Sequence, residues 1–452
     1  MKIQYLLKFP VISLCILLLF QLQAGAWSEH PLLVRPVLKD HPFWAIAAPV
    51  EVKSLATFLR ETAVALEPFL AKHESWSVNN LPGYVPCPAE LAFIPASDPE
   101  ELLRRFYHAI RLNPEARIPL YLYLFPGEER EGREMIPMEE LTTLDDTGSM
   151  PANAYVRLQA GEMVAPFRVL CTASDEPDYG FDLGLFEDNG TEYGAKYGFG
   201  EQPFGNPNLE YSSQAPFHMG FFHEARILYK FGPFLRKTFI DYRIFLFKAL
   251  SGFAFENNQP YWGWRFLGWS MHYLGDVSMP YHMRPLPGVS TSRMMWINLK
   301  AILGSSEAKD KAVQLVSNRH TVFEEFQLQM LHEVFLENKQ NHPFIKALRT
   351  PVRVVPFSLS YLVDVAAAES AASSKAADRA LKRNVPYRMV SVPDIEVSHL
   401  PEMQRLSGII REEKGQHAAD ELTRVIAQRM VSFARDIQVL FEDMLPSIKS
   451  QE

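Results

Sequence analysis

Cysteine is scarce in this sequence, with three residues among 452. Cys15 lies in an apolar segment at the start of the chain, so only Cys87 and Cys171 are left to form a disulfide elsewhere. Whether they are bridged, as an oxidising compartment permits, or are two buried thiols stays open. After the first apolar segment no run is long and apolar enough to cross a bilayer, which excludes a membrane-spanning fold for the rest of the chain.

Several catalytic motifs are also missing. The sequence contains no Gly-x-Ser-x-Gly elbow, no phosphate-binding loop and no dinucleotide fingerprint, and it shows no internal repeat. What remains is a globular composition, with 47% apolar and 22% charged residues. The length suffices for one large domain or two ordinary ones around a substantial core.

The first residues have the pattern of a secretory signal. Lys2 and Lys8 precede the apolar run 11–20, and small residues lead up to Ala26. We expect cleavage after Ala26 and a secreted or periplasmic product. Because the signal carries two lysines and no acid, its removal changes the net charge from −8 to −10, which argues against a nucleic-acid partner.

Apolar residues recur with helical spacing at 47–72 and 98–112. Prolines and charged loops then punctuate a stretch from about 80 to 170. Within that stretch, 118–125 and 154–170 are predicted to be strands.

Residues 171–216 are rich in Gly, Asp, Asn and Pro, as expected of a structured active-site loop. From Pro216 onward the pattern is helical almost to the end, including Val363–Leu381 and a final amphipathic helix over Leu422–Leu445. The predicted fold class is therefore mainly α, with a small β-containing insertion.

The predicted organisation has three parts. Residues 1–26 are the signal peptide, and 27–340 form a helical catalytic domain that carries the insertion at about 80–170. Residues 341–452 form a helical C-terminal region, either packed on the core or a small extra domain.

Histidine and aspartate occur with helical spacing in the stretch GWSMHYLGDVSMPYHMRPLPG, residues 268–288. His272 and Asp276 are four residues apart, so their side chains lie on one helix face. Pro280 is expected to end this helix and leave His282 on the exit turn, pointing into the same cavity.

A second pair, His320 and Glu324 in VSNRHTVFEEF, has the same spacing. One such pair alone is more commonly a surface or core hydrogen bond. Two pairs and an intervening histidine form a nitrogen and oxygen ligand set suited to zinc.

The expected mature chain begins WSEH, with Trp27 at its amino terminus and His30 close behind. A terminal amino group titrates near ~8, so a metal can bind it in the neutral form. Here the sequence resembles the zinc-dependent phospholipase C and S1/P1 nuclease superfamily. The resemblance lies in the initial Trp, in HYLGDVSMPYH (272–282) and in NRHTVFE (318–324), and it covers residues 27–30 and about 171–325.

The resemblance implies a helical bundle of the zinc-dependent phospholipase C type that binds three Zn²⁺ ions. Asp276 bridges two zinc ions that form a pair, and His272 also binds at this paired site. Trp27 and His30 are further ligands of one of the two ions. The full implied ligand set is Trp27, His30, Asp178, His218, His272, Asp276, His282, His320 and Glu324.

The acidic ligand before the core motif has three candidates in TASDEPDYGFD. Asp178 is favoured because the family's acid follows an acid-rich turn of small residues. Asp182 is its nearest competitor, and Asp175 stays open as well.

Two histidine assignments also have alternatives. His218 follows an aromatic residue at the end of the loop, where the family's ligand lies, and is favoured over His223. His30 is only three residues from Trp27 and is followed by proline, so His41 is kept as an alternative.

The implied function is that of a secreted zinc-dependent phospholipase C. It hydrolyses the glycerol-side phosphodiester of phospholipids, phosphatidylcholine foremost, with a water between the paired zincs as nucleophile, Asp178 as general base and Asp276 as bridging ligand. Glu324 favours this branch because nucleases usually carry Asp there. The alternatives are a single-strand nuclease of the S1/P1 type and a non-catalytic lipid-binding relative.

The expected partner is phospholipid at a membrane surface, contacted peripherally by a monomer. Aromatic residues near the loop are candidates for a cage around a choline head group, although core packing is the commoner role of such residues. They are Tyr179, Phe181, Phe217, Phe221 and Phe222.

Overall fold

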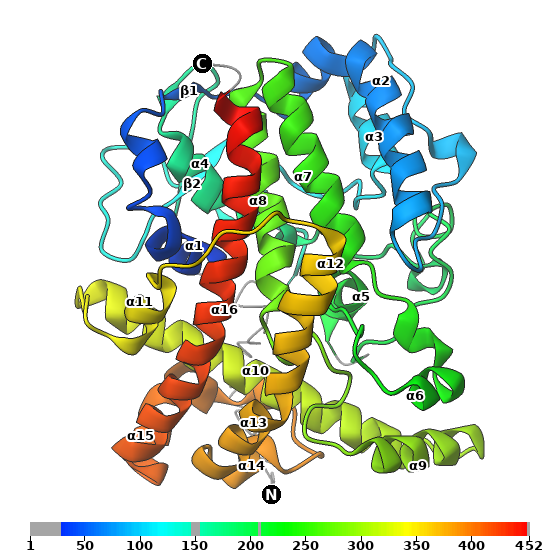
Figure 1. The fold of residues 1–452 in the computed structure, drawn as a ribbon, viewed down its shortest axis with the longest axis vertical. Coiled ribbons are helices and arrows are strands. Elements are labelled where there is room, and N and C mark those ends of the chain that lie inside the picture. Colours follow the sequence, from blue (N-terminus) through cyan, green and yellow to red (C-terminus); the bar gives the residue numbers. More distant parts are fainter. Residues whose placement is uncertain (1–28, 146–153, 207–208, 450–452) are drawn as a thin grey trace, which may run out of the picture.

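The computed structural model describes residues 29–145, 154–206 and 209–449 (Figure 1). The predicted signal peptide, 1–26, and the predicted ligand Trp27 lie outside these ranges. None of the described helices is long and apolar enough to cross a membrane.

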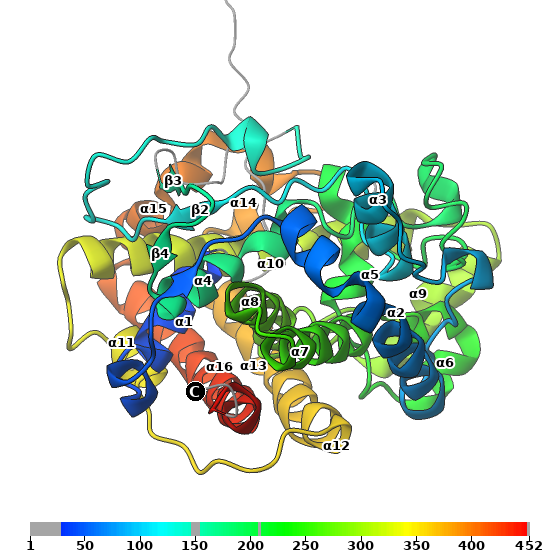
Figure 2. The same cartoon turned by 90° about the horizontal axis from the view of Figure 1, so that it is seen from above.

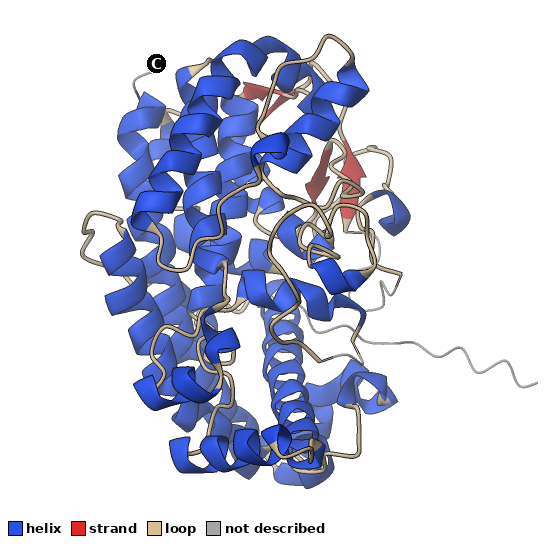
Figure 3. Cartoon of the chain, turned by 90° about the vertical axis from the view of Figure 1, so that its right-hand side faces the viewer, coloured by secondary structure: helices blue, strands red, loops and turns tan. Residues whose placement is uncertain are grey.

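Helices dominate the molecule, and the strands are confined to one region (Figure 3), which confirms the mainly α class. The helices are α1 (His30–Leu38), α2 (Leu55–Asn80), α3 (Pro99–Ala109), α4 (Pro166–Ala173), α5 (Ala215–His218), α6 (Arg226–Phe231), α7 (Ile240–Glu256), α8 (Pro260–Val277), α9 (Thr291–Ile302), α10 (Glu307–Leu336), α11 (Pro343–Leu348), α12 (Leu359–Tyr361), α13 (Ala368–Asn384), α14 (Tyr387–Val390), α15 (Leu406–Lys414) and α16 (Gln416–Lys449).

Two small antiparallel sheets accompany them. The first pairs β1 (Val50–Glu51) with β4 (Met163–Val164), and the second pairs β2 (Tyr121–Tyr123) with β3 (Tyr155–Arg157). The sheets are therefore shorter than predicted, and β1 lies before the predicted insertion.

The prediction that strand structure extends to residue 170 was wrong. Residues from Pro166 onward form α4, with the proline in the first turn. A proline at that position costs a helix nothing, because the first amide groups have no partner inside the helix. The apolar run that follows it belongs to a buried helix.

Helix α8 lies at the centre of the molecule (Figure 2), where α7, α4 and α16 pack around it. Every residue from Tyr261 to Val277 is buried. A helix that is buried on all sides has to be surrounded by other elements. His272 and Asp276 are therefore placed by packing in the interior of the protein.

Two glycines of α8 allow close contacts with neighbouring elements. A side chain at Gly268 would meet Ala173 at 2.6 Å and the carbonyl of Leu170 at 2.8 Å, so α4 packs directly on the helix here. At Gly275 a side chain would meet Phe433 at 2.6 Å and the ring of His30 at 3.1 Å. These glycines bring the loop after α4 and the start of α1 against the polar face of α8.

The C-terminal region packs on the rest of the protein. Helix α16 contacts α1, α7 and α8, and its apolar residues join the main hydrophobic core. Cys87 is half-buried and Cys171 is buried, and both are free thiols. No disulfide therefore joins Cys87 and Cys171 in the structure.

Candidate metal centre

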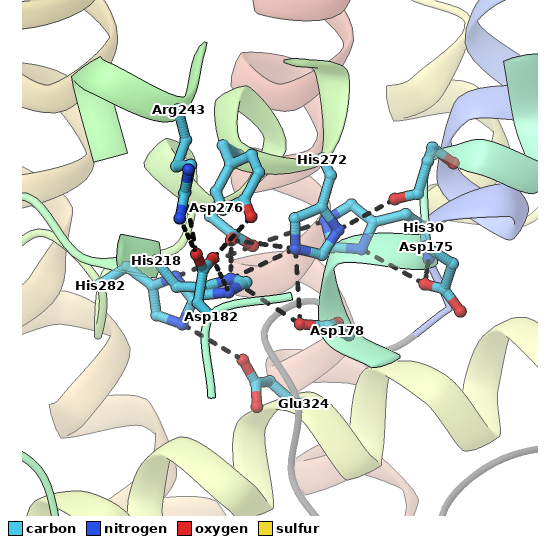
Figure 4. Close-up of polar contacts among 12 residues, drawn as sticks. His30, Asp175, Asp178, Asp182, His218, Arg243, His272, Asp276, His282 and Glu324 are labelled. Atoms are coloured by element: carbon cyan, nitrogen blue, oxygen red, sulfur yellow. Dashed lines mark hydrogen bonds and ion pairs between the residues drawn. The ribbon is translucent and has the colours of Figure 1, made fainter. Parts of the chain in front are cut away.

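Imidazole and carboxylate groups converge around the C-terminal half of α8 (Figure 4). Within the described part of the chain, four groups of three such side chains have ligand atoms within 4.8 Å of one another. They are His30 with His272 and Asp276, Asp178 with His218 and His272, His282 with His320 and Glu324, and His30 with Asp175 and Asp178. These groups could hold metal ions, and each predicted ligand among the described residues belongs to at least one of them.

The group around His272 has tetrahedral spacing. His218 Nδ1 lies 3.3 Å from His272 Nε2, and Asp178 Oδ1 lies 3.7 and 3.4 Å from these two nitrogens. Asp276 Oδ2 lies 2.9 Å from His218 Nδ1 and 3.5 Å from His272 Nε2. Ligand atoms on one tetrahedral zinc are ~3.4 Å apart, because each bond is ~2.1 Å long. Asp178, His218 and His272 therefore lie at the spacing of ligands on a single ion, and Asp276 Oδ2 is within reach of the same two nitrogens.

The second oxygen of Asp276 faces other imidazoles. Oδ1 lies 3.5 Å from His30 Nε2 and 3.8 Å from His282 Nδ1. The ring of His30 is close to that of His272, with centroids 4.2 Å apart. Since its two oxygens face different imidazoles, the carboxylate of Asp276 is placed to be shared by two ions.

The third group lies on the exit turn of α8 and on α10. His282 Nε2 is 3.0 Å from His320 Nε2, and Glu324 Oε1 is 3.8 and 2.7 Å from these nitrogens. Helix α8 ends at Val277, so His282 lies beyond it, as the sequence predicted. Burial raises the pKa of Glu324 to about 7, although His320 acts in the opposite direction.

A backbone carbonyl orients His272. Its Nδ1 lies 2.9 Å from the carbonyl oxygen of Ser174, and because a carbonyl can only accept, Nδ1 carries the proton. This leaves the lone pair of Nε2 directed at Asp178, His218 and Asp276. Ligating histidines are typically held in this way by the nitrogen that does not bind the metal.

Three donor atoms of the centre face one another without a hydrogen bond to any described residue. They are His30 Nε2, Asp276 Oδ1 and His282 Nδ1, and each of their side chains is at most 1% exposed. Burying polar atoms without partners is costly unless another group satisfies them. A bound cation would satisfy these atoms, so the site fits a metal.

The titration behaviour of the histidines reflects the crowded charges. Burial favours neutral imidazoles, yet Asp175 and Asp276 raise the pKa of His30 to about 9. In the same way, Asp182 and Asp276 raise the pKa of His218 to about 10 against the effect of burial. A metal ion would have to displace these protons, so metal binding weakens on acidification.

Asp182, the nearest alternative to Asp178, is committed to other partners. It accepts hydrogen bonds from Arg243 Nε at 2.8 Å, Arg243 Nη2 at 2.6 Å and the Tyr273 hydroxyl at 2.6 Å. Among the residues that the structure describes, it belongs to no candidate metal group. Asp182 also lies 3.4 Å from His218 Nε2, so its role is to orient that ring.

Asp175, the other alternative, also has firm partners. Its carboxylate accepts hydrogen bonds from the backbone amide of His30 at 2.9 Å and the Tyr179 hydroxyl at 2.7 Å. It contributes to one of the metal groups, with His30 and Asp178. Its main contribution is to anchor the start of α1 beside the centre.

We expect Asp178→Asn and Asp182→Asn to have different consequences. Asp178 has a side chain that is 17% exposed and faces two imidazoles, so its replacement should lower metal content and leave the metal-free fold intact. Asp182→Asn leaves the Arg243 charge buried and should lower the free energy of unfolding by ~3–5 kcal/mol. Denaturant unfolding of the metal-free variants, with metal analysis of the loaded ones, separates the two roles. The assignment is reversed if Asp178→Asn unfolds more easily and Asp182→Asn does not.

The two alternative histidines lie in other surroundings. His41 Nε2 is 2.9 Å from the Glu442 carboxylate, and His223 Nε2 donates to the Val363 carbonyl at 2.7 Å. Neither contributes to a metal group in the described ranges. The structure thus places His30 and His218, which the sequence favoured, in the centre.

Glu29 is a residue at the centre that sequence reasoning missed. Its carboxylate accepts hydrogen bonds from the Tyr123 hydroxyl and from His332 Nε2, both at 2.7 Å. Its backbone is left-handed, with φ 58°, which is uncommon for a residue with a side chain and costs ~1–3 kcal/mol. Only its position directly before His30 could have pointed to it.

A buried ion pair anchors the turn that carries Asp175 and Asp178. Glu176 accepts hydrogen bonds from Arg265 Nη2 at 2.8 Å and Trp269 Nε1 at 2.5 Å, and all three residues are buried. Arg265 and Trp269 belong to α8, so the turn and the helix are held together. No local pattern in the sequence signals the hydrogen bond from Trp269.

A cavity of about 530 Å³ opens onto the metal groups. Asp178, His218, His282 and His320 line one part of it. Another part is apolar and is lined by Leu228, Phe234, Leu286, Met294 and Ile297. A ligand with a polar, charged end and an apolar body matches this lining.

Of the aromatic residues proposed for a head-group cage, only Tyr179 and Phe221 line the cavity. Phe181 and Phe217 are buried in the main core, and Phe222 packs against it. Core packing therefore accounts for most of these side chains.

No family model matches the chain, and neither the curated proteins nor the solved structures contain a match.

Proposed function

We propose that this protein is a zinc-dependent phosphodiester hydrolase of the phospholipase C type. The observation that carries the proposal is the sharing of Asp276 between groups of imidazoles and carboxylates at ligand spacing, at the wall of a partly apolar cavity. A ligand set dominated by imidazole, with a few carboxylates, suits zinc better than calcium or magnesium. We propose three ions, one for each of the groups around His272, His30 and His282.

Each part of the centre has a role in this proposal. Bound zinc would supply positive charge to neutralise a phosphate and to make a water more acidic. The four side chains His218, His272, Asp178 and Asp276 would hold one ion, and Asp178, which lines the cavity, can accept a proton from the attacking water. No covalent nucleophile is needed for this reaction.

The cavity lining favours a lipid over a nucleic acid. Its charged residues are the acids Glu29, Asp175, Asp178 and Glu201 and the lysines Lys237 and Lys309. Since Asp175 and Asp178 belong to the metal groups, a polyanion strand would meet two acids and two lysines on the rest of the lining and no excess of bases, and much of the remaining wall is apolar. A phospholipid needs one phosphate at the metal centre and apolar walls for its glycerol and upper acyl carbons.

In the proposed reaction water attacks phosphorus and the bond between phosphorus and the glycerol oxygen breaks. The leaving oxygen takes up a proton. The reaction yields diacylglycerol and a phosphorylated head group. We place the enzyme outside the cytoplasm, in keeping with the signal sequence expected over 1–26.

The test is an assay of the purified, zinc-replete protein on phosphatidylcholine and on denatured DNA. Release of phosphocholine and diacylglycerol from the lipid, with DNA left intact, is the expected result. Cleavage of DNA without lipid hydrolysis would instead favour the nuclease alternative. A zinc content below two ions per chain would overturn the catalytic proposal and leave a non-catalytic binding protein.

A further inference from the structure

Helices α6 and α9 pack against each other (Figure 1). Together they carry an exposed face that is both apolar and basic. We name it the α6–α9 face. Its exposed apolar residues are Ile227, Phe231, Trp296, Leu299 and Leu303. Its cations are Arg226, Lys230, Arg293 and Lys300.

The apolar residues of α9 are aligned by helical spacing. Trp296, Leu299 and the C-cap residue Leu303 follow one another at intervals of three and four and are 40%, 47% and 76% exposed. Met294 and Ile297 point inward, are buried and line the cavity. Helix α9 is thus apolar on two sides. The described residues leave its outer apolar side exposed.

Cations surround the tryptophan. The guanidinium of Arg293 lies 4.4 Å from the ring centroid of Trp296, and the ammonium of Lys300 lies 4.0 Å from it. Residues 225–237 and 289–303 together contain six Arg or Lys residues and no Asp or Glu. The chain as a whole carries 53 acids against 45 bases, so this charge is local to the face.

The face has a small hydrophobic cluster of its own. Phe221, Leu228, Leu235 and Met294 form a core that is separate from the main one. Leu228 and Met294 belong to α6 and α9 and also line the cavity. The outer sides of these two helices therefore form the α6–α9 face, and their inner sides form part of the cavity wall.

We propose that the α6–α9 face docks on the surface of an anionic lipid bilayer. Tryptophan and leucine side chains on a short helix, bordered by Lys and Arg, have the composition of helices that lie in a membrane interface. The basic residues would contact anionic head groups, and the apolar ones the boundary of the acyl chains. This inference rests on the proposed function, because it identifies where the enzyme meets its substrate.

The experiment is co-sedimentation of the full chain with vesicles. One set contains phosphatidylcholine alone, and the other equal parts of phosphatidylcholine and phosphatidylglycerol. We expect binding to the anionic vesicles, weakened by salt. Arg293→Gln with Lys300→Gln should weaken it about fivefold for each charge. Trp296→Gln with Leu303→Gln should weaken it about tenfold or more.

The matched control is Val64→Gln with Leu336→Gln, which replaces apolar residues that are 82% and 64% exposed elsewhere on the surface. It should bind vesicles as the parent protein does. Thermal unfolding of each variant verifies that the changes leave the fold intact. Equal binding by all variants, or no binding to either vesicle, would overturn the proposal. Self-association that is lost in the Trp296→Gln and Leu303→Gln variant would assign the face to a second copy of the chain and also overturn it.

A short-chain phosphatidylcholine that is dissolved as monomers separates this proposal from the proposed function. The face variants should hydrolyse it at the parent rate while losing activity on vesicles. If no phospholipid is hydrolysed but vesicle binding depends on the face, the function fails and the docking surface stands. If monomers are hydrolysed and the face variants bind vesicles as the parent does, the docking surface fails and the function stands.

Discussion

Asp276→Asn should lower phosphodiester hydrolysis by at least ~1,000-fold, which corresponds to several kcal/mol of lost transition-state stabilisation. The carboxylate has one oxygen 2.9 Å from His218 and the other 3.5 Å from His30, so its replacement affects two metal groups at once. Surrounding imidazoles, His272 foremost, hold the pKa of Asp276 low against burial, which keeps it charged. We also expect the loss of more than one zinc per chain by metal analysis.

The control for this variant is Asp436→Asn. Asp436 is another fully buried aspartate, on α16, and it accepts hydrogen bonds from the Tyr361 hydroxyl on α12 and from Arg435 Nε on α16 itself. It belongs to none of the metal groups in the described ranges, so this variant should retain zinc and activity per folded molecule. An Asp276→Asn protein with full zinc content and activity within tenfold of the parent would contradict the bridging role.

Removal of metal should abolish hydrolysis and lower the thermal unfolding temperature by several degrees. Zinc at ~1,000 times its Kd stabilises a folded protein by ~4 kcal/mol for each independent site. Without it, His30 Nε2, Asp276 Oδ1 and His282 Nδ1 stay buried without a hydrogen bond to any described residue. The measurement is calorimetry and activity after chelation with dipicolinate, followed by re-addition of ions.

Zinc should restore both properties, and magnesium or calcium should not, because the ligand set is rich in nitrogen. In Asp276→Asn the unfolding temperature should respond much less to zinc. Recovery with calcium alone, or an unfolding temperature unmoved by chelation, would contradict the assignment of these residues to zinc.

The spacing of residues along helices is the part of the site that was predictable. His272 with Asp276 and His320 with Glu324 share helix faces because four residues complete about one turn. Pro280 gave the end of α8 to within a few residues, and with it the position of His282. The long apolar segments also gave the mainly α class correctly.

Choices among neighbouring residues of a loop were not predictable from the sequence. Asp175, Asp178 and Asp182 lie in one short stretch with the same chemistry, and the sequence could only rank them. Asp182 accepts hydrogen bonds from Arg243, which is 61 residues away on α7. Likewise α4 was taken for a strand, because a short apolar run has the same composition in either element.

By itself, the sequence determined which side chains could bind a metal and which of them share a helix face, because those properties depend on residue type and local geometry. Only the tertiary structure decided that His30, Asp178 and His218 meet around His272 and Asp276. Their approach depends on Gly268 and Gly275, which let α4 and α1 come close to α8, and on buried ion pairs between distant segments. Such contacts are fixed by packing across the whole core, and no local pattern encodes them.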